Sequence, residues 1–184
     1  MTAHDVQTAA TEPQIGAVLE PAHGAEIVVP LNRLSGHGPA GGRRLMVVLH
    51  LVDADDAGLI AALQGEGLPE PWAGRYFRAD DDSALAGYVG LEGQGRDLLL
   101  RSLVVSAHRK AQGLGSRILT AAEAVASDMG GERLHLLTTT AEPFFIRRGF
   151  VAADRETAPE AIRRTGEFTD ICPASAAYLT KDLG

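Results

Sequence analysis

The chain has 184 residues, 45% hydrophobic and 22% charged, and these proportions are typical of a folded globular domain. Its formal net charge of -7 argues against a general nucleic-acid binder, because phosphate contacts need clustered lysine and arginine. No apolar run is long enough to cross a membrane, and the first residues lack the features of a secretory signal peptide. A single cysteine, Cys172, excludes an intramolecular disulfide. We therefore expect a cytoplasmic protein without nucleic-acid or membrane partners.

Residues 1–44 differ in composition from the rest of the chain. They begin polar and alanine-rich, and residues 35–42 (SGHGPAGG) have the composition of a linker. Residues 27–31 are apolar, but Pro30 limits them to a short edge strand at most. We expect a flexible N-terminal extension over residues 1–44 and one domain over residues 45–184.

The first half of that domain reads as strands around one helix. Residues 45–51 are a predicted strand, and an aspartate at position 53, 55 or 56 can cap a helix predicted over residues 57–64. Further strands are predicted over residues 75–79, 84–92 and 97–105, with turns at residues 80–83 and 93–96. Strands interleaved with helices predict a mixed α/β sheet with helices on both faces.

Residues 98–115, LLLRSLVVSAHRKAQGLG, combine a buried strand, a polar turn and a glycine-containing loop at the start of a helix. Such a loop exposes backbone N–H groups that no helical carbonyl satisfies, and the helix dipole adds partial positive charge. These features predict a phosphate or pyrophosphate site. The alternative is a tight turn without a ligand. A dinucleotide fingerprint would need a glycine at Ile118, and a P-loop would need Gly-Lys-Ser/Thr after the second glycine.

The following segments continue the alternation of helix and strand. The helix after the loop carries an apolar stripe, and Gly130 and Gly131 are expected to end it. Residues 133–138 read as a strand, and Pro143 suits the first turn of a short helix. The stripe consists of Leu114, Ile118, Ala122, Val125 and Met129.

The order strand, Lys110-x-x-Gly113-x-Gly115, helix resembles the acetyl-CoA loop of the GNAT superfamily of N-acetyltransferases. Residues 141–150, AEPFFIRRGF, resemble the second signature of that superfamily, a short helix with an aromatic residue four positions before a Gly-Phe pair. Residues 100–103 and 137–140 and the tail from residue 158 resemble the small GNAT enzymes associated with bacterial arsenic-resistance operons. More distantly, they resemble amino-acid N-acetyltransferases of the N-acetylglutamate synthase type.

The resemblance implies the GNAT fold, a mixed central sheet splayed between its fourth and fifth strands with helices on both faces. Here these strands would be residues 98–105 and 133–138. It also implies acetyl-CoA as co-substrate and direct attack on the thioester by a small amino-acid-like or arsenical amine, as in arsenic resistance. No metal is predicted, since the six histidines form no close ligand pair. A protein or peptide N-acetyltransferase and a non-catalytic acetyl-CoA-binding module stay open, as does the choice between monomer and homodimer.

The implied acetyl-CoA site draws on the strand, the loop and the second signature. Backbone groups of the strand would pair with the pantetheine arm, and an N–H near Val104 or Val105 would stabilise the oxyanion. N–H groups of the loop would hold the pyrophosphate, and Lys110, where the family usually has arginine or glutamine, would add a point charge. The predicted cofactor-binding residues are Leu103, Val104, Val105, Lys110, Ala111, Gln112, Gly113, Leu114, Gly115, Ser116, Thr138, Phe145 and Arg148.

The groups that transfer protons are left open. Phe145 stands where the family often has a tyrosine that protonates the CoA thiolate, and a phenyl ring cannot donate a proton. We therefore expect Phe145 to pack against the cofactor. The candidate bases are Glu92, His135, Glu142 and Glu167. A water chain is an equal alternative, and a structural role is the preferred interpretation of each of the four.

Arg101 is a cation within an apolar strand and needs an anionic or carbonyl partner. Strand alternation predicts that Arg101 shares a face with Leu99, Leu103 and Val105, and that Ser102 lies on the opposite face. We list both polar residues as candidate substrate-binding residues.

Two roles are open for Arg101. As substrate-binding residues, Arg101 and Ser102 would line the acceptor pocket, where the guanidinium would hold a carboxylate or an arsenical oxyanion. The favoured alternative is an internal salt bridge from Arg101 to Glu92 or Glu142.

Overall fold

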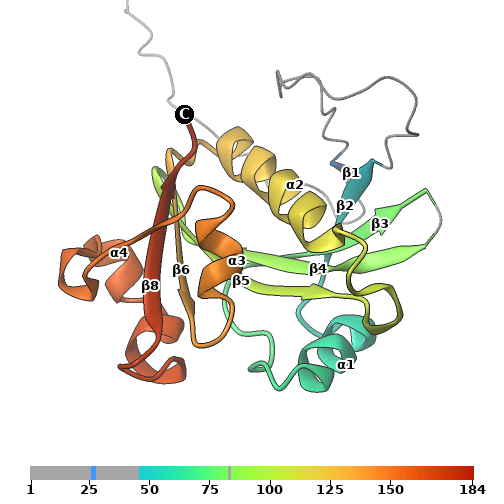
Figure 1. Ribbon diagram of the computed structural model, residues 1–184, viewed down its shortest axis with the longest axis horizontal. Helices are drawn as coiled ribbons and strands as arrows, with labels where there is room; N and C mark the ends of the chain where they lie inside the picture. Colours follow the sequence, from blue (N-terminus) through green and yellow to red (C-terminus); the bar gives the residue numbers. More distant parts are fainter. Residues whose placement is uncertain (1–25, 28–45, 83) are drawn as a thin grey trace, which may run out of the picture.

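One sheet organises the fold of residues 26–27, 46–82 and 84–184, which the computed structural model describes (Figure 1). Its strands are β1 (Glu26–Ile27), β2 (Val47–Val52), β3 (Arg75–Asp81), β4 (Leu85–Glu92), β5 (Asp97–Val105), β6 (Arg133–Thr138), β7 (Val151–Ala152) and β8 (Ala177–Asp182). They lie in the order β1-β2-β3-β4-β5-β6-β8-β7. The β5–β6 pair is parallel and the other neighbours are antiparallel, so the sheet is mixed.

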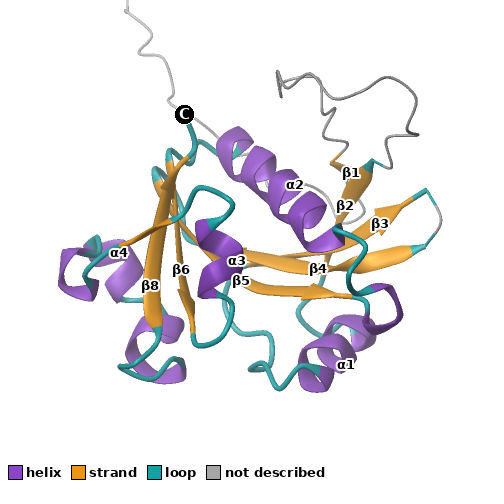
Figure 2. Ribbon diagram, viewed as in Figure 1, coloured by secondary structure: helices purple, strands orange, loops and turns teal. Residues whose placement is uncertain are grey.

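Helices cover both faces of this sheet (Figure 2). They are α1 (Ala57–Gly65), α2 (Leu114–Asp128), α3 (Glu142–Ile146) and α4 (Glu160–Arg163), with the short turns η2 (Ala107–Arg109) and η3 (Arg155–Thr157) and the π-helical turn η4 (Glu167–Ile171). The apolar side of α2 forms the main core with one face of β4 and β5, whereas α1 and α4 pack against the opposite face in two smaller clusters. The predicted mixed sheet with helices on both faces is confirmed.

Local sequence signals set the ends of the first two helices. The Asp56 side chain accepts a hydrogen bond of 2.7 Å from the Leu59 N–H and caps α1. Gly130, with φ of 85°, follows the end of α2, and the Gly131 N–H donates to the Ala126 carbonyl at 2.8 Å. This is the Schellman arrangement that a glycine in the left-handed region permits. Both helix ends agree with the sequence prediction.

A β-bulge at Ser102 changes the direction in which the end of β5 faces. Ser102 has φ of 54°, and the register between β4 and β5 shifts at this point. The extra residue reverses the alternation, so Leu103 and Val105 pack with the α2 core while Leu99 lies in the cluster with α4. The expectation that Arg101 shares a face with Leu103 and Val105 is therefore wrong.

Shorter elements differ from the expectations at several points. Strand β3 continues to Asp81, into the segment expected as a turn, and residue 83 lies outside the described residues. The very short β7, α4 and η4 have no periodic signal long enough to predict.

Of the expected extension, only residues 26–27 are described, as the edge strand β1. Within the described ranges, no helix has the length and apolar composition of a membrane span.

Strands β5 and β6 diverge along their length. They pair only from Asp97 opposite Arg133 to Leu99 opposite His135, although β5 continues to Val105 and β6 to Thr138. Figure 1 shows β4 and β5 running across the view while β6 and β8 stand nearly upright. Backbone groups of residues 100–105 on the β6 side consequently lack a strand partner within the described sheet. This confirms the predicted splay.

Candidate active site

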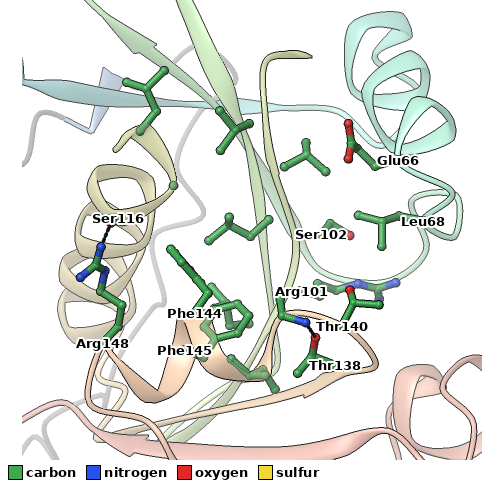
Figure 3. Close-up of a pocket in the computed structure, with 18 of the residues that line it drawn as sticks. Glu66, Leu68, Arg101, Ser102, Ser116, Thr138, Thr140, Phe144, Phe145 and Arg148 are labelled. Atoms are coloured by element: carbon green, nitrogen blue, oxygen red, sulfur yellow. Dashed lines mark hydrogen bonds between the residues drawn. The ribbon is translucent and has the colours of Figure 1, made fainter. Parts of the chain in front are cut away.

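A cavity of about 620 Å³ opens where β5 and β6 separate (Figure 3). Its walls are the end of β5, the end of β6 with the threonines that follow it, the loop before α2, the inner side of α3 and the segment after α1. All of the residues predicted to bind acetyl-CoA line this cavity except Gln112. Arg101 and Ser102 line it as well. Segments far apart in the sequence thus meet at one site.

The loop before α2 lines the cavity and leads directly into the first turn of that helix. Ala111 and Gly113 both have left-handed backbones, with φ of 65° and 72°. Gly113 is the residue preceding the first turn of α2, and without a side chain it cannot cap the N–H groups of that turn. A Cβ placed on Gly113 meets no atom within 4 Å, so the space in front of the helix terminus is open. Turns that contain left-handed residues can form anion-binding concavities lined by backbone N–H groups.

Two cationic side chains lie at the rim beside this helix terminus. The guanidinium of Arg148 contacts the Ser116 hydroxyl in the first turn of α2 (Figure 3) and stands over the Phe144 ring, 5.5 Å from its centre. Lys110 Nζ lies 2.6 Å from the Glu66 carboxylate, which comes from the end of α1. The rim can therefore direct positive charge toward an anion, provided that Lys110 leaves Glu66.

Aromatic rings fill the α3 side of the cavity. Phe145 is buried and makes edge-to-face contacts with Phe144 and Phe150, at centroid distances of 5.0 and 5.4 Å. The nearby hydroxyl of Thr138 accepts a hydrogen bond of 3.0 Å from the Ala141 N–H. At position 145 the wall is apolar and offers no proton donor.

A buried ionic cluster surrounds Arg101 at the wall of the cavity. Arg101 Nη1 donates to Glu92 Oε2 at 2.6 Å and to the Ala73 carbonyl at 3.2 Å. Its Nη2 lies 3.1 Å from Glu167 Oε1, close enough for an ion pair although the geometry is not that of a hydrogen bond. The Arg101 side chain is 1% exposed. Among the alternatives from the sequence, the contacts to Glu92 are those of an internal salt bridge, and Glu167, not Glu142, is the second carboxylate.

None of the four candidate bases lines the cavity. Glu92 and Glu167 belong to the cluster around Arg101, and Glu142 occupies the first turn of α3. His135 is buried between the Tyr178 hydroxyl, 2.6 Å from Nδ1, and the Asp97 carboxylate, 2.8 Å from Nε2. Glu92, Glu167 and His135 thus have polar partners away from the cavity, and none of the four candidates lies with the loop before α2 in its lining.

The environment of His135 favours its neutral form. Burial lowers the pKa of His135 below its ordinary value, although the hydrogen bond to Asp97 acts in the opposite direction. Burial also raises the pKa of Tyr178 to about 12, so this hydroxyl keeps its proton. A neutral His135 with its proton on Nε2 can donate to Asp97 and accept from Tyr178, which satisfies all three groups.

Cys172 is predicted to be unreactive in the native protein. Burial raises the pKa of Cys172 to about 12, and the hydrogen bond from its thiol to Glu167, 3.1 Å long, acts in the same direction. The thiolate is the reactive form, and at pH 8 its population should be about a thousandfold below that of an ordinary thiol. Reaction with Ellman's reagent should therefore be very slow until guanidinium unfolds the chain. Stoichiometric labelling of native protein at the unfolded rate would contradict this expectation.

Several lining residues have no signal in the sequence. Glu66 and Leu68 follow α1 and reach the cavity only through the tertiary fold, and Figure 3 shows Leu68 across from Ser102. Thr139 and Thr140 could have been inferred, because they directly follow Thr138 at the end of β6.

Within residues 26–27, 46–82 and 84–184, no group of three histidine, cysteine, aspartate or glutamate residues is placed to hold a metal ion.

Residues 72–152 match a family model described as acetyltransferase (GNAT) domain. N-Acetylglutamate synthase from Neisseria gonorrhoeae, solved with coenzyme A and N-acetyl-glutamate, superposes with a TM-score of 0.62 and 22% identity, over 77% of this chain and 36% of that chain. A GNAT family acetyltransferase from Elizabethkingia anophelis with acetyl-CoA bound superposes with a TM-score of 0.52 and 16% identity, over 74% of this chain and 97% of that chain. IAA acetyltransferase from Bacillus cereus superposes with a TM-score of 0.51 and 16% identity, over 74% of this chain and 99% of that chain.

These similarities differ in what they cover. The chain spans only about a third of the length of the synthase, and the identities to the solved structures are low enough that the likeness is one of fold. The family match extends from the segment before β3 to β7 and includes both the loop before α2 and α3. Residues 72–152 are thus similar to a GNAT acetyltransferase domain, and the solved structures share the fold of this chain.

Proposed function

We propose that this chain is an acetyl-CoA-dependent N-acetyltransferase that acts on a small amino-acid-like or arsenical amine. The observation that carries the proposal is that one cavity joins an uncapped helix terminus to an unpaired strand edge. The helix terminus suits a pyrophosphate, and the strand edge suits a chain of amides. Coenzyme A carries both of these groups, one after the other.

The residues present fit this co-substrate. Acetyl-CoA would supply the acetyl group as an activated thioester. The N–H groups of residues 111–116 would hold the pyrophosphate, with Lys110 and Arg148 as flanking charges. The edge of Leu103, Val104 and Val105 would pair with the pantetheine amides, since these residues line the cavity and β6 does not pair with them. Phe145 would pack against the sulfur end of the arm.

The acceptor amine would attack the thioester carbonyl directly. A backbone N–H at Val104 or Val105 would donate to the carbonyl oxygen as negative charge develops there. The φ of Ser102, which is uncommon for a residue other than glycine, is consistent with a backbone held in a fixed direction for this purpose. The proton of the amine would leave through water, because the four candidate bases lie outside the lining of the cavity.

The acceptor would approach from the side of Glu66, Leu68 and Ser102. This wall is mixed in polarity, which suits a small amine with polar and apolar parts. The synthase from Neisseria gonorrhoeae was solved with an N-acetylated amino acid, which supports an amino-acid-like acceptor within this fold. The tail that resembles arsenic-resistance enzymes adds arsenical amines to the candidates.

A thiol-release assay with acetyl-CoA and a panel of amines tests this function. We expect release of CoA with one or more small amino acids or amino-arsenicals, and no release with peptides or alkyl amines. Release with peptides alone would favour a protein acetyltransferase. The absence of a hydroxyl at Phe145 favours one further candidate, a non-catalytic acetyl-CoA-binding module, which would bind acetyl-CoA without any turnover.

The substitution Phe145→Tyr is expected to leave turnover within a few-fold or to raise it. Phe145 lies in an apolar wall without a proton donor, and a tyrosine hydroxyl could add general acid catalysis, typically worth about a hundredfold or more where it operates. Steady-state rates at saturating acetyl-CoA and amine would measure the change. A loss of activity with undiminished acetyl-CoA affinity would show that the shape of the phenyl ring is required.

A further inference from the structure

Arg109 stands next to Lys110 in the cofactor loop but does not line the cavity. Its guanidinium makes a two-pronged contact with Asp81 at the end of β3, with Nη1 donating to Oδ1 at 2.9 Å and Nη2 to Oδ2 at 2.5 Å. Nη1 also approaches the carbonyls of Ala84 and Leu85 at 3.2 and 3.4 Å. Arg109 therefore ties the loop to the β3–β4 hairpin and is not available to a phosphate.

Burial distinguishes this ion pair from others on the surface. The Asp81 carboxylate is fully buried and the Arg109 side chain is 16% exposed. A second two-pronged pair on the same hairpin, Arg78 with Asp80, has side chains 45% and 25% exposed and joins two residues of β3 to each other. Only the first pair connects the hairpin to the cofactor loop, because Arg109 belongs to η2 and Arg78 to β3.

The loop needs such an anchor because part of its backbone is strained. Ala111, two residues after Arg109, has φ of 65°, a conformation that residues other than glycine rarely adopt. Such a conformation persists only where its surroundings determine it fully. The start of the loop is held by the hydrogen bond from the Ser106 N–H to the Ala86 carbonyl at 2.8 Å, and η2 ends at Arg109. The Arg109–Asp81 contact fixes the position from which the strained segment departs.

We propose that Arg109 is a positioning residue that, through Asp81, holds the pyrophosphate-binding loop in its left-handed conformation. This inference rests on the proposed function, since it assumes that the loop binds the pyrophosphate of acetyl-CoA. Loss of the contact should relax the backbone around Ala111 and move the N–H groups away from the phosphate oxygens. The pantetheine end of the cavity, on β5, should be unaffected.

Two acyl donors separate this role from a general effect on folding. S-Acetylpantetheine carries the thioester and both amides but no pyrophosphate, so its use does not depend on the loop. We expect Arg109→Gln to lower kcat/KM for acetyl-CoA by roughly ten- to a hundredfold, mainly through KM, because small misplacements of binding groups have effects of this size. The value for S-acetylpantetheine should stay within about twofold, since that donor lacks the phosphates that the loop would hold. Arg78→Gln, the matched control, should change neither value.

Each outcome decides the inference. If a folded Arg109→Gln variant keeps the wild-type ratio of kcat/KM for acetyl-CoA to kcat/KM for S-acetylpantetheine, the positioning role of Arg109 is refuted. This holds whether both values fall or neither does. Should that variant fail to fold, Arg109→Lys keeps the charge beside Asp81 but cannot make the two-pronged contact, and an intermediate ratio is expected. Wild-type protein that uses neither donor and does not bind CoA in calorimetry would instead refute the proposed function, before any variant is compared.

Discussion

The substitution Gly113→Val is expected to weaken acetyl-CoA binding by about a hundredfold or more while the fold is kept. Gly113 has φ of 72°, where a β-branched residue is strained by about 1–2 kcal/mol. Its Cβ position meets no protein atom and faces the open space before α2, so the added side chain would occupy the approach of a phosphate. Each loss of about 1.4 kcal/mol in binding is tenfold in affinity. Calorimetric titration with acetyl-CoA measures the effect.

Gly95 offers a matched control for this experiment. It also has a positive φ, 78°, and its Cβ position meets no atom within 4 Å, but it lies in the turn between β4 and β5 and does not line the cavity. Gly95→Val should therefore carry a similar cost in stability without changing the affinity for acetyl-CoA. An unchanged affinity in folded Gly113→Val protein would remove the pyrophosphate from this loop.

The substitution Arg101→Met is expected to destabilise the protein by about 3–5 kcal/mol, because removing one partner of a buried ion pair leaves an uncompensated charge. Here two carboxylates, Glu92 and Glu167, would lose the same cation, and both have side chains less than one-eighth exposed. For a chain of this length, such a loss lowers the melting temperature by roughly 10 °C. Thermal unfolding followed by circular dichroism measures it.

The exposed pair of Arg133 and Asp182 is the control for this substitution. Its atoms are 2.6 Å apart, as in the pair of Arg101 and Glu92, but its side chains are 49% and 72% exposed. Arg133→Met should change stability by less than about 1 kcal/mol, as is usual for surface ion pairs. If Arg101→Lys or Arg101→Met kept the melting temperature but raised the KM of the acceptor amine, Arg101 would instead be a residue that binds the substrate.

The parts of the site that the sequence predicted are those with local causes. The loop before α2 depends on glycine in a left-handed conformation and on a helix start, and both are visible in a few consecutive residues. The cap at Asp56 and the helix end at Gly130 are local in the same way. Even the splay of β5 from β6 follows from a resemblance carried by two short motifs.

The parts that could not be predicted depend on contacts between distant segments. Ser102 carries no sequence signal for a bulge, yet the bulge decides which residues of β5 face α2. Glu66 reaches Lys110 only through the tertiary fold, since 44 residues separate them in the sequence. The sequence offers Glu167 as a candidate base, but its place beside Arg101 depends on how the tail folds back. Strand alternation and motif spacing contain no information on these encounters.

The position of β8 between β6 and β7 has a consequence for synthesis of the protein. Strand β6 forms one wall of the cavity. One of its edges pairs with β5 only from Arg133 to His135, and β8 covers the opposite edge along its whole length. On the ribosome, β6 emerges before β8, so the β6 edge that β8 will cover is unpaired at first. Strands β2–β5 and helix α2 can already pack against one another at that stage. Unpaired strand edges are the places where nascent chains aggregate. The cavity is thus completed late, and chaperones that shield strand edges would act on this half of the nascent domain.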